Sequence, residues 1–137
     1  MKERFPSEVE AMLREAGWYP GRSELPVELP NDYSIFPWAR KALEEFGGLH
    51  VGSSGPGRDL ARSNIQFEPD AAEGLAPHVS QTDDGLRLYP LGEIDNGHAH
   101  LLIDELGSVY YYFDELEKVG VTLDEALINL LLGMKAG

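Results

Sequence analysis

The sequence predicts one α+β domain in which helices flank a mainly antiparallel sheet. Residues 86–113 show the pattern of three strands joined by tight turns, and segments with helical periodicity stand before and after them. The chain has 137 residues, and no internal repeat or clear linker divides it, so we expect one domain over residues 1–137. We therefore expect helices to cover one side of a central three-stranded meander.

The run of residues 86–113 (LRLYPLGEIDNGHAHLLIDELGSVYYYF) carries the signals of the meander. Pro90 has no N–H for a strand ladder, so the first strand is expected to end there. Residues 95–97 are Asp-Asn-Gly, which tolerate the positive φ of a tight turn. Residues 98–103 (HAHLLI) follow the period of two that predicts a strand with one buried face.

A second turn and a third strand complete this run. Residues 104–107 (DELG) predict the turn, and residues 108–113 are rich in the β-branched and aromatic residues typical of strands. The three tyrosines at 110–112 must alternate between the two faces of the sheet. Because Tyr111 then points opposite to its neighbours, we expect at least one tyrosine ring to be exposed and available for binding.

Two amphipathic helices are predicted before the meander. The first has Ser7 as its N-cap, with Glu10 three residues later to complete a capping box. Gly17 is expected to end this helix. The second helix is expected to begin near Pro37, a favoured first-turn residue, and to stop at Gly47-Gly48.

The segment between the second helix and the meander carries weaker signals. Residues 49–51 and 64–68 predict short strands, and residues 52–59 (GSSGPGRD) predict a flexible loop. A short helix is expected within residues 69–78, followed by a polar turn at residues 82–85.

The chain after the meander predicts one more helix. Residues 114–120 are expected to form a short helical or turn segment. Thr122 and Glu125 then form a second capping box, and Gly133 closes the most apolar helix of the chain.

The net charge of −13 is the strongest compositional feature. Residues 1–70 carry 8 basic and 12 acidic residues, and residues 71–137 carry 3 basic and 12 acidic residues, so the net charges are −4 and −9. Such a field repels nucleic acid and anionic lipid and speeds encounter with basic partners. Acidity that serves only solubility is the alternative.

Several kinds of chemistry are excluded or disfavoured. The chain has no cysteine, which excludes disulfides, thiolate zinc sites and a catalytic thiol. Residues 52–58 are glycine-rich but lack the spacing of a phosphate-binding loop, so we favour a plain loop there. His98 and His100 are a possible metal pair, but no recognisable ligand set completes it, and we favour half-exposed histidines. We expect no cofactor. A pair of catalytic carboxylates that come together only in the folded chain is kept as an alternative hypothesis.

The first ten residues (MKERFPSEVE) are not expected to form a signal peptide, and the longest apolar run of the chain is only a few residues. We therefore expect a cytoplasmic protein that does not enter a membrane.

Five stretches together resemble a known family. They are FPSEVEAMLREAGWYPGR (5–22), ALEEFGGLHV (42–51), LYPLGE (88–93), LLIDELGSVYYY (101–112) and GVTLDEALINLLLG (120–133). Their order and spacing resemble the SUKH superfamily, and most of all its third subfamily of bacterial immunity proteins. The resemblance implies an α+β sheet with flanking helices and no catalytic machinery. It also implies protection against polymorphic toxins, often nucleases or deaminases, through binding of the toxin domain.

The positions that match the family signature are interpreted as fold-defining and not as a binding site. They are Trp18, Gly21, Arg22, Gly47, Gly48, Pro90, Gly92, Asp104 and Gly107.

Three functional hypotheses follow. The first is a non-enzymatic immunity protein that binds a cognate, basic toxin domain and binds neither nucleic acid nor membrane. The second is an intracellular scaffold or regulatory module of the same superfamily, and the third is a small hydrolase or metalloenzyme. For the first, carboxylates beside the turns of the meander and one tyrosine are the candidate toxin contacts: Asp83, Asp84, Glu93, Asp95, Glu105 and Tyr111.

Overall fold

A computed structural model describes residues 4–25, 28–30, 33–53 and 55–134. The main sheet is antiparallel and has six strands in the order β1-β4-β5-β6-β7-β8, and β2 and β3 form a separate pair. None of the helices in the described ranges is both long and apolar enough to cross a membrane. The elements are α1 (Ser7–Ala16), α2 (Pro37–Phe46), β1 (His50–Val51), β2 (Gly55–Pro56), β3 (Ala61–Arg62), β4 (Ile65–Gln66), a 3-10 helix (Pro69–Ala72), β5 (Leu88–Ile94), β6 (Ala99–Asp104), β7 (Val109–Tyr112), β8 (Leu116–Gly120) and α3 (Leu123–Leu132).

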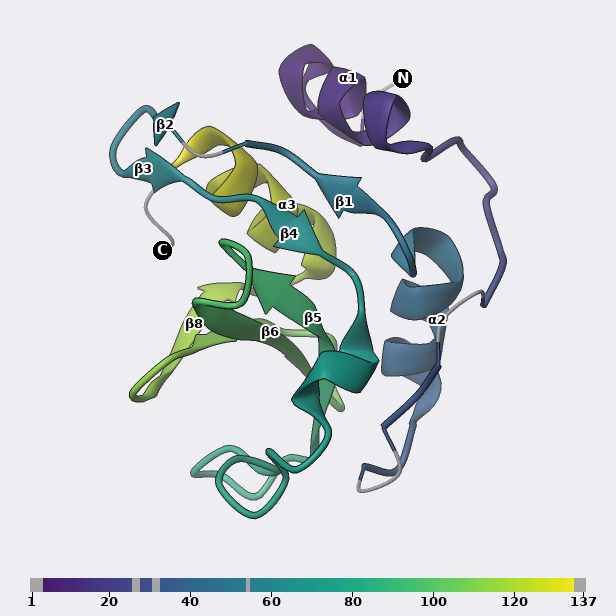
Figure 1. The fold of residues 1–137 in the computed structure, drawn as a ribbon, viewed down its shortest axis with the longest axis vertical. Helices are drawn as coiled ribbons and strands as arrows, with labels where there is room; N and C mark the ends of the chain where they lie inside the picture. The colour runs from purple at the N-terminus through teal and green to yellow at the C-terminus, as the bar shows by residue number, and fades with distance from the viewer. Residues whose placement is uncertain (1–3, 26–27, 31–32, 54, 135–137) are drawn as a thin grey trace.

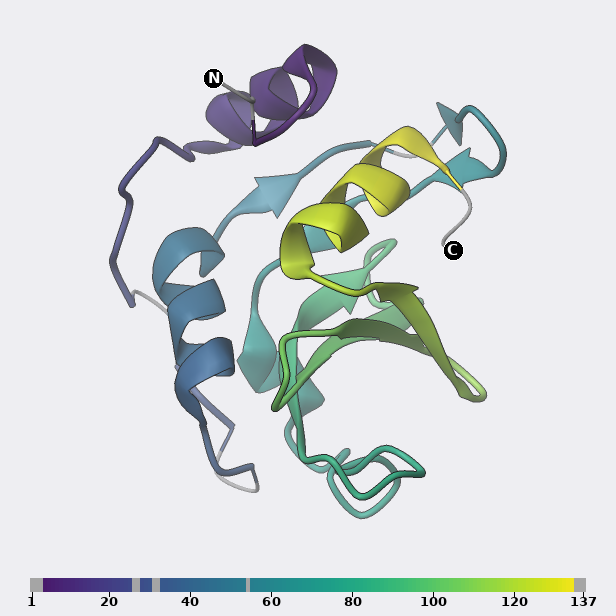
Figure 2. The same cartoon turned by 180° about the vertical axis from the view of Figure 1, so that it is seen from behind.

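The helices pack on one face of the six-stranded sheet, as expected (Figures 1 and 2). Buried residues of all three helices join Leu101, Ile103 and Val109 of the sheet in the main core. The α+β fold with a mainly antiparallel sheet is therefore confirmed.

The opposite face of the sheet is also partly buried, which the sequence did not predict. Leu88, Leu102 and Tyr110 pack there with Val79 from the segment before β5. The expectation of one buried face for residues 98–103 is therefore wrong at Leu102, because the chain folds back over the second face.

Pro90 does not end its strand. It pairs with Leu102 and Gly92 pairs with Leu101, so the ladder passes through a bulge that accommodates the proline. A Cβ atom at Gly92 would lie 1.9 Å from the carbonyl oxygen of Gln66, so β4 and β5 approach too closely there for any side chain.

Two further expectations are wrong because strand pairing overrides weak local signals. Residues 114–120 contain β8, which pairs with β7 and forms an edge of the sheet. Residues 52–59, which were expected to form a plain loop, contain β2, and β2 pairs with β3.

Gly57, which follows β2 in this hairpin, lies against the end of α3, because its Cβ would be 2.7 Å from the Cα of Gly133.

The helix ends follow the sequence except at the first cap. Gly17 ends α1 with a φ of 113°, and the Thr122 hydroxyl accepts a hydrogen bond from the Glu125 N–H at 3.1 Å. Ser7, however, is the first helical residue and makes no cap bond, because Pro6 occupies the cap position and its carbonyl accepts from the Glu10 N–H. The capping box expected at Ser7 is therefore wrong.

Arg22 is a buried cation that joins the segment after α1 to the end of α2. Its guanidinium donates to the carbonyl oxygens of Glu45, at 2.7 Å, and Gly47, at 3.0 Å. These are carbonyls that the end of a helix leaves without intrahelical partners. Arg22 therefore caps α2 from a distant part of the chain.

The buried phenol of Tyr89 makes stability sensitive to alkaline pH. Its ring meets Tyr33 and Phe36 edge-on, and within the described residues its hydroxyl has no hydrogen-bond partner. Burial raises the pKa of Tyr89 to about 12 from an ordinary value of 10.0. The unfolded state releases this proton first, so unfolding becomes more favourable as the pH rises from about 10 to 12.

We expect Tyr89→Phe to change the free energy of unfolding by less than about 1 kcal/mol at pH 8, because it removes an unpaired hydroxyl and keeps the ring. At pH 11 the variant should be more stable than the wild-type protein. Urea unfolding at both pH values measures this, and equal pH dependence of the two proteins would contradict it.

Candidate functional site

Two turns of the meander lie together at one end of the sheet. One joins β5 to β6, and the other joins β7 to β8 (Figure 1). The rings of His98 and Phe113, one from each turn, stack with their centroids 4.6 Å apart. Because turns alternate along a meander, the turn between β6 and β7 lies at the opposite end.

Carboxylates gather at the end of the sheet that holds the β5–β6 and β7–β8 turns. Within the described ranges, none of them forms an ion pair. One of these carboxylates, Asp95, is held in place by a hydrogen bond that it accepts from the Asn64 N–H at 3.2 Å. We name this surface the acidic end, and its members are Glu93, Asp95, Asp114, Glu115 and Glu117.

The structure separates the acidic residues that the sequence offered as toxin contacts. Glu93 and Asp95 lie at the acidic end. Asp83 and Asp84 are exposed in the turn before β5, and Glu105 lies in the β6–β7 turn at the far end.

Glu105 is also occupied by an internal partner. Its carboxylate accepts from the Arg87 backbone N–H at 2.7 Å and from the Arg87 guanidinium at 3.2 Å. These bonds hold the pKa of Glu105 below its ordinary value.

Three members of the acidic end were not predicted as toxin contacts from the sequence: Asp114, Glu115 and Glu117. The missing signal was β8. Strand β7 brings the chain to this end, and because β8 pairs with β7 the turn between them is a tight hairpin that lies beside the β5–β6 turn. In β8, Glu117 is paired with Tyr111, so the two side chains lie on the same face.

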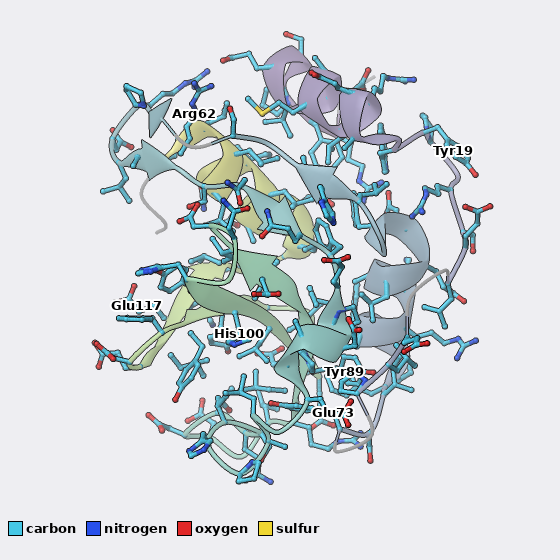
Figure 3. The ribbon with its side chains drawn as sticks, in the orientation of Figure 1. Tyr19, Arg62, Glu73, Tyr89, His100 and Glu117 are labelled. Carbon is cyan, nitrogen blue, oxygen red and sulfur yellow. The ribbon has the colours of Figure 1, made fainter. Side chains whose placement is uncertain are left out.

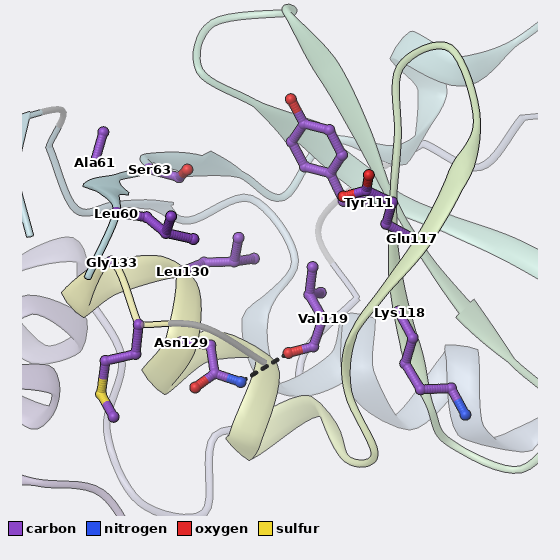
Figure 4. A pocket seen from close by; sticks show the side chains of 11 residues that line it. Leu60, Ala61, Ser63, Tyr111, Glu117, Lys118, Val119, Asn129, Leu130 and Gly133 are labelled. Atoms are coloured by element: carbon purple, nitrogen blue, oxygen red, sulfur yellow. Dashed lines mark hydrogen bonds between the residues drawn. The ribbon is translucent and has the colours of Figure 1, made fainter. Parts of the chain in front are cut away.

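An open groove of about 790 Å³ adjoins the acidic end on the helix-covered face (Figure 4). Tyr111, Glu117 and Val119 form the wall from the sheet, and the end of α3 forms the other wall. The Asn129 side chain donates to the Val119 carbonyl at 2.9 Å and thereby holds α3 against β8. The described residues that line it are Leu60, Ala61, Ser63, Tyr111, Glu117, Lys118, Val119, Asn129, Leu130, Gly133 and Met134.

Tyr111 is the aromatic residue of this groove. It contacts the main core, whereas Tyr110 and Tyr112 belong to the cluster on the other face, so the predicted alternation is confirmed. The expectation of an exposed ring is wrong, because Tyr110 is buried and the other two are half-buried. Burial raises the pKa of Tyr111, and the nearby charges of Asp95 and Glu117 raise it further. Tyr111 is therefore a neutral ring beside two carboxylates.

The two histidines singled out in the sequence do not form a metal site. His98 lies in a turn against Phe113, whereas His100 lies on β6 and points away from the helices (Figure 3). Burial lowers the pKa of His100, and Glu93 partly offsets this. Across the described part of the chain, no three histidine, aspartate or glutamate residues are placed to hold a metal ion.

Comparison with known protein families identifies the chain as an immunity protein. Residues 5–133 match the family model described as SUKH-3 immunity protein, and the chain belongs to this family. Its resemblance to the third SUKH subfamily is thus confirmed. No curated protein and no solved structure matches the chain. Family membership implies a toxin-neutralising function, and immunity proteins of this kind are generally non-enzymatic.

Proposed function

We propose that this protein neutralises a cognate polymorphic toxin domain in the bacterial cytoplasm by placing its acidic end against a basic surface of the toxin. Family membership supplies the kind of partner. The observation that supports the surface is a group of carboxylates at one end of the sheet, beside a groove and without ion pairs among the described residues. The mechanism is occlusion and needs no catalytic group.

The charge of the acidic end fits toxins that act on nucleic acid. Nucleases and nucleic-acid deaminases need cationic clefts to hold phosphates. Carboxylates on two adjacent turns present negative charge to such a cleft as successive phosphates do. Because the whole chain has a net charge of −13, its field also accelerates the encounter with a basic partner.

A second surface supports the alternative of a protein-binding scaffold. At the opposite end of the sheet, Trp38 is 49% exposed, Leu106 is 70% exposed and Val121 is 61% exposed. The Trp38 ring lies against Gly107 of the β6–β7 turn, whose Cβ would be 3.3 Å from it. Exposed tryptophan is a common anchor of protein interfaces, so this patch serves recognition by apolar contact in the scaffold hypothesis.

Neutralising the acidic end should slow association with the cognate toxin domain. The variant is Asp95→Asn, Asp114→Asn, Glu115→Gln and Glu117→Gln combined. We expect its association rate constant to fall by about tenfold at low salt, because electrostatic steering is lost. The deficit should shrink near 0.5 M salt, where the Debye length is only about 4 Å. Stopped-flow association across an ionic-strength series measures both effects.

A control variant with the same change in net charge separates a local surface from a global field. It combines Asp70→Asn, Glu73→Gln, Asp83→Asn and Asp84→Asn, all of which alter exposed residues away from the acidic end. We expect this control to slow association by only about twofold. Equal slowing by both variants would show that net charge alone matters. Loss of toxin binding in Trp38→Ala, with no effect of the acidic-end variant, would favour the patch around Trp38 instead.

A further inference from the structure

We propose that the groove beside the acidic end binds an arginine side chain of the partner, together with an adjacent apolar side chain. This inference rests on the proposed function, because it names the chemistry with which a basic toxin would enter the site.

The shape of the groove calls for more than one side chain. Its volume of about 790 Å³ lies within the roughly 300–1,000 Å³ range of small-molecule pockets. Leu60, Val119, Leu130 and Met134 give it an apolar lining, and Leu60 is 53% exposed. Such a lining suits one apolar side chain and the methylene stem of a long cationic one.

The polar side of the groove favours a cation. Glu117 is exposed and pairs with Tyr111 across β7 and β8, so its carboxylate and the tyrosine ring face the same space (Figure 4). The charge of Asp95 also lies close enough to Tyr111 to raise the pKa of its phenol. A guanidinium group can stack on the aromatic ring and bond a carboxylate at once, which a lysine ammonium does less well.

Among the described residues of the lining, Lys118 is the one cation, and it does not neutralise this space. Lys118 is paired with Tyr110, and its ammonium lies 5.8 Å from the centre of that ring. Tyr110 belongs to the cluster on the other face of the sheet, so the charge of Lys118 is directed away from the groove. As far as the described residues go, the carboxylate of Glu117 therefore stands beside the Tyr111 ring without an ion-pair partner.

The test uses two short peptides that differ only in charge. Acetyl-Leu-Arg-amide is titrated into the 15N-labelled full chain at low salt, beside acetyl-Leu-citrulline-amide, a neutral analogue of the same shape. We expect saturable shifts at the amides of Tyr111, Val119 and Leu130 for the arginine peptide, and at least about fivefold weaker binding for the citrulline peptide. Equal binding of the two peptides, or shifts confined to residues outside the groove, would overturn the proposal.

Single substitutions assign the binding to the two groups proposed. Glu117→Gln should weaken arginine binding by about threefold or more, whereas Tyr111→Phe should preserve it because the ring remains. Asp83→Asn, which changes an exposed carboxylate away from the groove, is the matched control and should have no effect. If Glu117→Gln binds as the wild-type protein does, Glu117 does not hold the guanidinium and the proposal fails. The toxin is absent from this titration, so its outcome is separate from that of the association measurements.

Discussion

Replacing Asp104 with alanine is expected to lower the free energy of unfolding by about 3–5 kcal/mol. Asp104 is 1% exposed and lies at the end of β6. One carboxylate oxygen accepts from the N–H groups of Leu106, at 2.8 Å, and Ser108, at 3.1 Å. The other accepts from the Tyr110 hydroxyl at 2.7 Å. Alanine would leave the buried Ser108 N–H and the buried Tyr110 hydroxyl without their acceptor.

Two milder variants test whether the loss comes from these bonds. Asp104→Asn keeps an oxygen for the two N–H bonds of the turn, and we expect it to cost less than half as much as alanine. Tyr110→Phe removes the third donor, so combining it with Asp104→Asn should be less destabilising than the sum of the single changes. Urea unfolding of the wild-type protein, Asp104→Ala, Asp104→Asn, Tyr110→Phe and the double variant gives the comparison. A loss below about 1 kcal/mol in Asp104→Ala would show that Asp104 does not hold the turn together.

The elements that the sequence predicted well have strong local signals at their ends. Helix α2 begins at Pro37 as expected, and Gly133, with a φ of 66°, closes α3. The Asp-Asn-Gly turn also follows from its residues, since Asp95 and Asn96 both have positive φ. Such signals act over a few residues and need no knowledge of the rest of the fold.

The elements that were missed depend on contacts between distant residues. Strand β8 has the sequence LEKVG, whose pattern is interrupted by a bulge where Val119 is left unpaired between Lys118 and Gly120. It becomes a strand because β7 offers it a ladder. Pro90 likewise predicts the end of a strand from local sequence, whereas the bulge between Pro90 and Gly92 lets the strand continue.

The members of the candidate site also could not be predicted from local sequence alone. Asp95 was predicted as a toxin contact because it is a carboxylate in a turn, but Asp83 and Glu105 were predicted on the same basis. Only the number and direction of the strands decide which turns meet at one end of the sheet. Because residues 114–120 were expected to be helical or a turn, Glu117 and its partner Tyr111 were not placed in one groove.

The two ends of the sheet differ in their internal bonding. At the β6–β7 turn, Asp104 and Glu105 are both engaged within the chain, by the hydrogen bonds of the turn and by Arg87. At the acidic end, the carboxylates form no ion pair within the described ranges. A surface that binds another protein needs charges that are not already paired, so this difference supports the acidic end as the recognition surface.

Trp18→Ala is expected to lower the free energy of unfolding by about 3–5 kcal/mol, as for other large aromatic residues removed from a core. Trp18 is 5% exposed and packs edge-on against Phe5, with ring centroids 5.8 Å apart. Its indole N–H donates to the Glu45 carboxylate at 3.0 Å, and the same oxygen accepts from Arg4 at 2.6 Å. The substitution therefore removes core packing and one bond that joins the end of α1 to α2.

Trp18→Phe is the matched variant, because it keeps an aromatic ring and loses chiefly the indole hydrogen bond. We expect it to cost about 1–2 kcal/mol. Urea unfolding measures the stability of both variants, and stopped-flow association of the folded fraction with the toxin domain measures binding. If Trp18 acts through the fold, Trp18→Ala lowers protection only by reducing the amount of folded protein, and its folded fraction associates at the wild-type rate. A variant that unfolds at the same urea concentration as the wild-type protein yet no longer binds the toxin would instead place Trp18 in the interface.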